Sequence, residues 1–91
     1  MSRRRVVITG LGVISALGSS IEQFWDGLLN GRSGIRRITK FDPSELPCQV
    51  AGEIPDFNPR EYMPIKEARR YARSAQIGLA AACQAVAEAG F

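Results

Sequence analysis

A short apolar run followed by two closely spaced glycines constrains the fold more than any other feature of this chain. Residues 6–8 are Val-Val-Ile, and Gly10 and Gly12 follow them. An uninterrupted β-branched run is typical of a strand that is covered on both faces in a layered α/β protein. The glycines permit a positive φ or the close approach of another backbone. The opening residues therefore predict a strand, a glycine turn and a helix.

The helix is predicted to begin at the serines 19–20, each of which can cap a helix and has Glu or Gln at capping-box distance. Apolar residues then recur at helical spacing, and Gly31 is placed to end the helix after about residue 30. Phe24 and Trp25 are interpreted as core residues of this helix. The alternative is an aromatic platform for bases or ligands.

In the middle of the chain the apolar residues no longer recur at helical spacing. Residues 32–46 contain Gly and Pro and predict a connecting loop, with a single turn at 42–46. Residues 49–54 predict a second, weaker strand that Pro55 ends, and residues 56–63 a further loop. Cys48 is interpreted as a packed thiol and not a nucleophile, because the chain has no histidine to activate it.

A long helix is predicted from Pro64 until Gly90, because alanines and larger apolar residues follow Pro64 at three- and four-residue steps. Its apolar face is narrow and rich in alanine. Such a face lets another backbone approach closely, so we expect this helix to pack deep in a larger layer. Cys83, at the edge of the face, is interpreted as a core residue.

Four cations share the opposite face of that predicted helix. They stand at positions i, i+3, i+4 and i+7, namely Lys66, Arg69, Arg70 and Arg73. On one helix this spacing forms a basic stripe near the positive end of the helix dipole, with Glu61 and Glu67 nearby. The stripe predicts an anion-binding surface, and the alternative is a solvated charged face. Tyr71 is the only aromatic residue within it, which argues against single-stranded nucleic acid.

Composition narrows the possible functions. The 91 residues suggest at most one domain with a small core, and the net charge of +3 is too mild to indicate a nucleic-acid partner. With no histidine and two cysteines, the chain lacks a disulfide framework and the usual metal ligands, so we expect no metal and a reducing compartment, the cytoplasm. No stretch approaches the roughly 20 apolar residues of a membrane span, and the glycine-interrupted N-terminus argues against a secretory signal.

A dinucleotide site at Gly10 and Gly12 is a further hypothesis, because glycines after a strand resemble the dinucleotide fingerprint. Ser15 occupies the position of the third glycine, and no acidic residue ends a second strand about twenty residues on. Structural glycines explain the pattern better, and we assign no cofactor-binding residue.

Several motifs occur together and in order: RRVVITGLGVIS, FWDGLLNGRSGI, ITKFD, VAGEIPDF, KEARR and a terminal EAG. In this combination the chain resembles the N-terminal segment of a β-ketoacyl-acyl carrier protein synthase, of the discrete, fatty-acid elongating type. The resemblance covers essentially all 91 residues, so residues 1–91 are expected to be an incomplete part of one synthase N-terminal domain, without an internal boundary.

The resemblance implies the layered thiolase fold, usually a homodimer, and a decarboxylative Claisen condensation of an acyl-enzyme with malonyl-acyl carrier protein. The segment would supply a strand, a glycine turn, a helix, a loop, a short strand and a long helix. In this family a cysteine and two histidines later in the chain perform the chemistry, and neither cysteine here matches that motif. No catalytic residue is therefore assigned, and this segment alone is expected to be inactive.

The same resemblance implies a binding partner for the basic stripe. In similar enzymes a lysine and two arginines matching Lys66, Arg69 and Arg70 form part of the docking surface for the acidic helix of acyl carrier protein. Arg73 is placed with them as a fourth docking residue. Tyr71 and Ala72 replace a methionine and an aspartate common in relatives. Two alternatives stay open: a chain-length factor, which is a partner subunit without the nucleophile, and a non-enzymatic module that binds an acidic protein.

Overall fold

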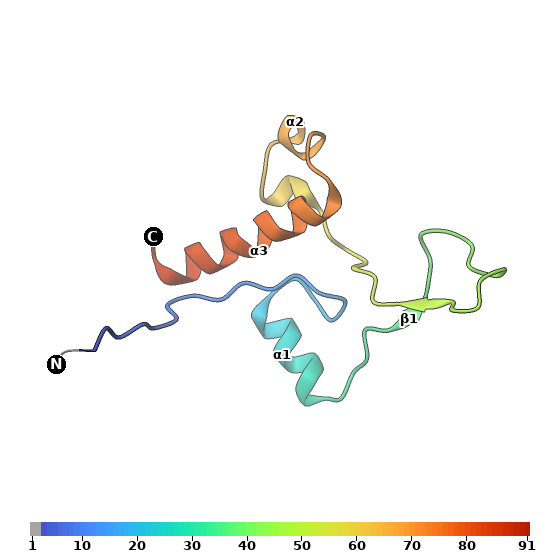
Figure 1. Ribbon diagram of the computed structural model, residues 1–91, viewed down its shortest axis with the longest axis horizontal. Helices are drawn as coiled ribbons and strands as arrows, with labels where there is room; N and C mark the ends of the chain where they lie inside the picture. The colour runs from blue at the N-terminus through green and yellow to red at the C-terminus, as the bar shows by residue number, and fades with distance from the viewer. Residues whose placement is uncertain (1–2) are drawn as a thin grey trace.

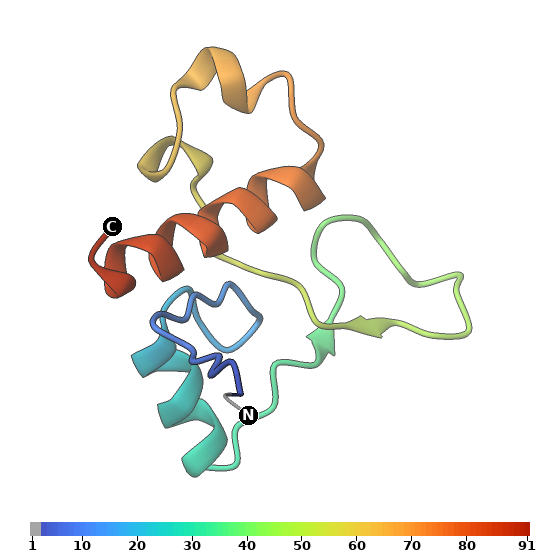
Figure 2. The same ribbon diagram turned by 60° about the vertical axis from the view of Figure 1, so that its left-hand side comes forward.

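The computed structural model describes residues 3–91 (Figure 1). Its elements in chain order are helix α1 (Ile21–Leu29), strands β1 (Arg36–Arg37) and β2 (Val50–Ala51), the 3₁₀ helix η1 (Pro59–Glu61), and helices α2 (Ile65–Ala68) and α3 (Arg73–Ala89). The two strands pair antiparallel, with Arg36 opposite Ala51. The chain before α1 runs between α1 and α3 in both ribbon views (Figures 1 and 2).

The arrangement is open. Its principal extents are 61 × 37 × 24 Å and its radius of gyration is 16.7 Å, whereas a compact domain of this length would have about 12 Å. The buried apolar residues are few: Phe57, Met63, Ala68 and Ala80. Most of them lie around η1 and α2, so the small core sits where these short helices meet α3. Within residues 3–91, no helix combines the length and apolar character needed to cross a membrane.

The predicted strand at residues 6–8 is absent. Val6, Val7 and Ile8 are 94%, 68% and 82% exposed, and these residues belong to no strand. A strand is defined by hydrogen bonds to a neighbouring strand, and no part of the chain that the structure describes supplies one here. The apolar run is thus present as an uncovered extended segment.

Gly10 and Gly12 pack directly against α3, which confirms close approach as the reason for these glycines. A Cβ at Gly12 would overlap the Ala81 carbonyl oxygen, and one at Gly10 the Ala85 carbonyl oxygen. Two extended residues span about 6.7 Å and four helical residues about 6 Å, so the Gly-Leu-Gly spacing matches successive turns of the helix. Neither glycine has a positive φ. The space that a pyrophosphate would need is filled by helix backbone, which opposes the dinucleotide hypothesis.

Helix α1 confirms the prediction at both ends. The Ser20 hydroxyl accepts a hydrogen bond from the Gln23 N–H at 3.2 Å, and Gly31 follows the helix with φ of 65°. The Gln23 side-chain oxygen accepts in turn from the Ser19 N–H at 2.9 Å. Within this helix the interpretation of Trp25 as a core residue is wrong, because its side chain is 59% exposed. Phe24 is half-buried.

The segment from β1 to β2 is a hairpin with a long connection, where a loop followed by a strand was predicted. Only Val50–Ala51 of the predicted strand forms, because its partner β1 is two residues long. The turn predicted at 42–46 is confirmed by a hydrogen bond from the Leu46 N–H to the Pro43 carbonyl at 2.9 Å. Cys48 is exposed, so its interpretation as a packed thiol is wrong.

Glu53 closes this hairpin connection. Its carboxylate accepts hydrogen bonds from the N–H and hydroxyl of Thr39, both at 2.9 Å, and from the Lys40 N–H at 3.1 Å. These bonds stabilise the charged form, so they lower the pKa of Glu53, with the Thr39 N–H contributing most. The carboxylate thus ties the end of β2 to the chain that follows β1.

The predicted continuous helix from residue 64 to 89 is wrong. Helix α2 ends at Ala68 and α3 begins at Arg73, because Ala72 has an extended backbone with φ of −63° and ψ of 158°. Met63 and Ala68 are buried, and α2 packs against η1. This packing determines the corner between α2 and α3, which intrinsic helix propensity does not predict. Cys83 is exposed on α3 and not a core residue as interpreted from the sequence.

Candidate functional site

The four cations of the predicted stripe lie at the corner between α2 and α3 and not along one helix. Lys66 is on α2, Arg69 caps its C-terminus, Arg70 lies in the turn, and Arg73 opens α3. All four are exposed. The single-helix stripe is therefore wrong in its geometry, because the break at Ala72 resets the spacing before Arg73. The corner itself is a compact basic projection, and we call these four residues the basic corner.

Gln76 holds the basic corner in shape. Its side-chain amide donates to the Ala68 carbonyl at 2.6 Å and, more weakly, to the Tyr71 carbonyl at 3.4 Å. The Ala68 carbonyl ends α2 and the Tyr71 carbonyl lies in the turn after it, where helix hydrogen bonding leaves acceptors unsatisfied. Sequence reasoning missed Gln76. Its signal is a long polar side chain among the small and apolar residues that make up most of α3.

Arg73 differs from the other three cations. Its guanidinium carbon lies 4.8 Å from the centre of the Phe57 ring, and the Phe57 and Tyr62 rings stack with centroids 6.1 Å apart. The helix dipole destabilises a cation in the first turn of a helix. A cation–π contact at an exposed site stabilises it by about 0.5–1 kcal/mol. Arg73 is thus oriented by an aromatic residue of its own chain.

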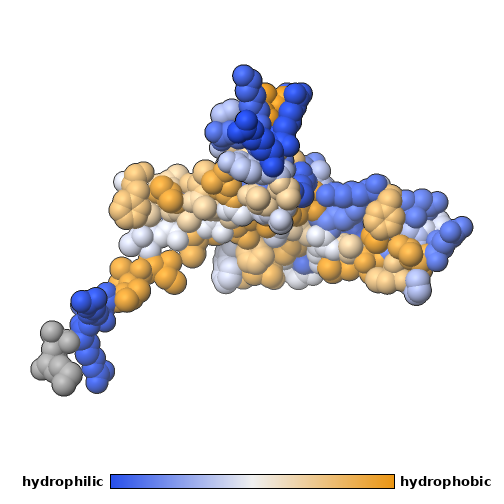
Figure 3. All heavy atoms as spheres, turned by 45° about the horizontal axis from the view of Figure 1, so that its top comes forward, coloured by the Kyte–Doolittle hydropathy of each residue, from blue (hydrophilic) through white to orange (hydrophobic). Residues whose placement is uncertain are grey.

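The remaining cations of the basic corner are electrostatically available. Among residues 3–91 the ion pairs are Arg32–Asp26 and Arg37–Asp42, so neither Glu61 nor Glu67 pairs with the corner. Figure 3 shows hydrophilic side chains gathered over the α2 region at the top of the view, with a small hydrophobic area between them. Unpaired Lys and Arg side chains on a projection are suited to carboxylates or phosphates.

Gln84 joins the N-terminal segment to the rest of the molecule. Its side-chain oxygen accepts from the Val13 N–H at 3.0 Å, and its amide donates to the Ser19 carbonyl at 2.6 Å and the Tyr62 hydroxyl at 3.0 Å. One side chain on α3 therefore holds the chain before α1 and the end of η1. Sequence reasoning also missed this residue, because its partners are 22 to 71 positions away.

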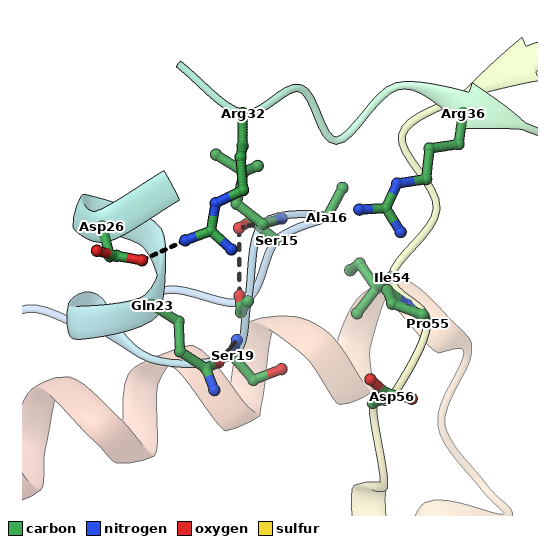
Figure 4. Close-up of a pocket in the computed structure, with 12 residues that line it drawn as sticks. Ser15, Ala16, Ser19, Gln23, Asp26, Arg32, Arg36, Ile54, Pro55 and Asp56 are labelled. Carbon is green, nitrogen blue, oxygen red and sulfur yellow. Dashed lines mark hydrogen bonds and ion pairs between the residues drawn. The ribbon is translucent and has the colours of Figure 1, made fainter. Parts of the chain in front are cut away.

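A concavity of about 510 Å³ lies between the Ser15–Gly18 turn, α1 and the segment after β2. In Figure 4 Arg32 reaches Asp26 on α1, and Arg36 extends from β1 toward the turn, above Ile54. Its lining combines carboxylates with guanidinium groups, namely those of Asp26, Asp56, Arg32 and Arg36.

The two cysteines lie apart from the basic corner. Cys48 precedes β2, where its thiol lies 3.5 Å from the Val50 carbonyl, and Cys83 lies on α3. In the described part of the chain, His, Cys, Asp and Glu side chains form no group of three that could hold a metal ion.

Comparison with known families identifies the chain. A family model described as the N-terminal domain of β-ketoacyl synthases matches residues 3–91. The chain belongs to the β-ketoacyl synthase family. As a β-ketoacyl synthase segment it spans about a fifth of the length of the curated relatives it matches, 21–22% for those described below.

Three curated relatives illustrate the range of this similarity. A 3-oxoacyl-[acyl-carrier-protein] synthase 2 from Coxiella burnetii is 43% identical over 90 residues, 99% of this chain and 22% of that protein. The synthase 2 from Synechocystis is 39% identical over 89 residues, 98% of this chain and 21% of its own length. A granaticin polyketide putative β-ketoacyl synthase 2 from Streptomyces violaceoruber is 41% identical over 88 residues, 97% of this chain and 21% of that protein.

A solved structure, the ishigamide ketosynthase/chain length factor, matches this β-ketoacyl synthase segment with a TM-score of 0.85 and 43% identity. The match covers 99% of this chain and 22% of that one. The open path of residues 3–91, helices with a small two-stranded sheet, is therefore similar to an α/β segment of that ketosynthase/chain length factor.

Proposed function

We propose that residues 1–91 are the N-terminal segment of a 3-oxoacyl-[acyl carrier protein] synthase that elongates fatty acyl chains. The observation that carries this proposal is the family match over residues 3–91, with relatives that are themselves named acyl-carrier-protein synthases. The reaction is a decarboxylative Claisen condensation. The malonyl unit loses carbon dioxide, the resulting enolate carbon bonds to the acyl carbon held on an enzyme cysteine, and the acyl–sulfur bond breaks to release the cysteine thiol. The cysteine and its two histidines belong to other parts of such an enzyme.

The segment's first role is to complete a larger α/β core, which we propose to be the layered thiolase fold. Val6, Val7 and Ile8 are exposed and extended, and an apolar strand with free edges is a liability unless another strand covers it. The radius of gyration of 16.7 Å likewise indicates surfaces that a larger core would cover. We expect residues 6–8 to become a strand in that sheet.

The segment's second role is to dock acyl carrier protein, at Lys66, Arg69 and Arg70, with Arg73 as a fourth contributor. Unpaired cations at a helix corner complement the carboxylates of an acidic helix and the phosphate of the phosphopantetheine arm. Contacts of this kind raise the association rate and make it dependent on salt. Arg73 is expected to contribute less, because Phe57 already engages its guanidinium.

The whole protein is proposed to be a cytoplasmic homodimer. It would need no cofactor or metal, since its acyl groups arrive attached to the carrier. These properties follow from the resemblance to discrete type II synthases.

A non-catalytic partner subunit is the second candidate. The observation that favours it is the similarity, at 43% identity, to a structure described as a ketosynthase/chain length factor. A chain-length factor would keep the same core and the same basic corner, so residues 1–91 fit both roles.

The test is an assay of the natural protein that contains this sequence, supplied with acyl- and malonyl-acyl carrier protein. Formation of the 3-oxoacyl product by the protein alone supports the synthase. Carbon–carbon bond formation only after a second ketosynthase subunit is added would support the chain-length factor. Carrier binding without either activity would support a module that only binds an acidic protein.

A further inference from the structure

We propose that the carrier-docking surface extends beyond the basic corner into a groove between η1 and α2, where Arg60 provides a further cation and Ile65 and Tyr71 receive an apolar side chain. The occupant is an acidic helix that presents one apolar residue flanked by carboxylates. This inference rests on the proposed function and specifies what the carrier must present.

The groove is an open hollow of about 490 Å³ beside the basic corner. Ala68, which is buried, forms part of its base, and Ile65 and Tyr71 form apolar walls that are 39% and 43% exposed. Gln76 also lines the groove while its amide holds the Ala68 carbonyl at 2.6 Å. The hollow is therefore built on a hydrogen-bonded corner, and its apolar walls are open to solvent.

Cations border the apolar part. Arg60 comes from η1 and Arg69 from the end of α2, and both line the groove. Asn58 fixes the start of η1 by accepting from the Arg60 N–H at 3.1 Å. Within residues 3–91, the Arg60 side chain forms no ion pair. An apolar hollow with cations from two separate elements is the complement of an apolar side chain flanked by carboxylates.

A helix presents such a pattern readily. Residues three and four positions apart lie on one face, so an apolar residue can stand between two carboxylates. Protein interfaces commonly combine an apolar centre with a polar rim, and Tyr and Arg are enriched among the residues that contribute most. The apolar and charged parts should act differently: rim charges govern association and its salt dependence, whereas a seated apolar side chain governs dissociation.

The experiment measures association and dissociation rates of a holo-acyl carrier protein on the immobilised natural protein, at low and raised salt. Arg60→Glu should slow association about threefold to tenfold at low salt and flatten its salt dependence, with dissociation little changed. Ile65→Ser and Tyr71→Ser should each speed dissociation about threefold to tenfold without changing the salt dependence. Arg36→Glu, a charge reversal on β1, is the matched control and should leave both rates nearly unchanged.

A triple variant with Lys66, Arg69 and Arg70 changed to alanine separates the two proposals. If this variant loses binding while Arg60→Glu behaves like Arg36→Glu and neither serine variant dissociates faster, the groove is overturned and the docking function stands. If the triple variant binds like the unmodified protein, the docking function itself fails, and the groove with it. Thermal melting of each variant identifies misfolding, and the two serine variants provide independent tests of the apolar walls.

Discussion

The Gln84 side-chain oxygen accepts a hydrogen bond from the Val13 backbone N–H at 3.0 Å, across 71 positions of sequence. The same amide group donates to the Ser19 carbonyl at 2.6 Å. The Gln84 side chain thus hydrogen-bonds backbone groups of the segment before α1. In a sheet, a neighbouring strand would supply such partners. The N-terminal segment is positioned by this contact and by the glycines that let it approach α3.

Gln84→Ala is expected to lower the free energy of unfolding by about 1–3 kcal/mol, because it leaves a part-buried N–H and carbonyl without their partners. Urea denaturation of the natural protein and the variant measures the difference. Glu88→Ala, an exposed change on the same helix, is the control and should have a much smaller effect. Equal effects of the two substitutions would contradict the account of Gln84.

Two glycine substitutions should change stability in opposite directions. Gly12→Ala places a Cβ against the Ala81 carbonyl oxygen, so it is expected to destabilise by about 1–3 kcal/mol. Gly78→Ala on α3 adds a Cβ that meets nothing within 4 Å and improves helix propensity, so it should stabilise by about 0.5–1 kcal/mol. Denaturant midpoints measure both changes. A neutral Gly12→Ala would show that the close packing against α3 is not needed.

The features that the sequence predicts correctly depend on nearby residues. Helix α1 has its cap at Ser20, its apolar period and its terminal Gly31 within a dozen positions. A close approach at Gly10 and Gly12 is also predicted, although the alanines that meet them, Ala81 and Ala85, are distant in the sequence and are not predicted as the partners.

The features that the sequence did not predict depend on distant partners. Strand β1 consists of Arg36 and Arg37, which have no strand pattern and become a strand only by pairing with β2. The break between α2 and α3 depends on the Gln76 side chain and on burial against η1. For the candidate site, charge spacing located the basic corner but assumed one helix. Arg60 was missed because it lies in a segment without periodicity.

Gln76→Ala is expected to loosen the basic corner, since it removes the amide that holds the Ala68 carbonyl. Hydrogen exchange should accelerate over residues 65–72, while exchange in the middle of α3 stays near its original rate. Carrier affinity should fall by about two- to tenfold, because binding then has to order the corner. Ser74→Ala, an exposed change on the same helix, is the control. Unchanged exchange over residues 65–72 would contradict this role of Gln76.

Stability should fall in acid partly through Glu53. Hydrogen bonds from Thr39 lower its pKa in the folded protein, so the carboxylate contributes stability above its unfolded pKa of about 4.3 and loses that contribution as the pH falls through the lower folded value. Glu53→Gln should therefore show a smaller loss of stability between neutral pH and pH values below about 4. Unfolding curves measured across this range, with Glu45→Gln as control, test the assignment. An unchanged pH dependence in Glu53→Gln would contradict it.

The most direct measurement of the central claim is titration of the protein with holo-acyl carrier protein at low and raised salt, alongside the triple alanine variant of Lys66, Arg69 and Arg70. The account predicts binding that weakens as salt increases and that is largely lost in the variant, whose thermal melting should match that of the unmodified protein. A folded protein that binds no carrier, or that binds it equally well without those three side chains, would contradict the docking role of the basic corner.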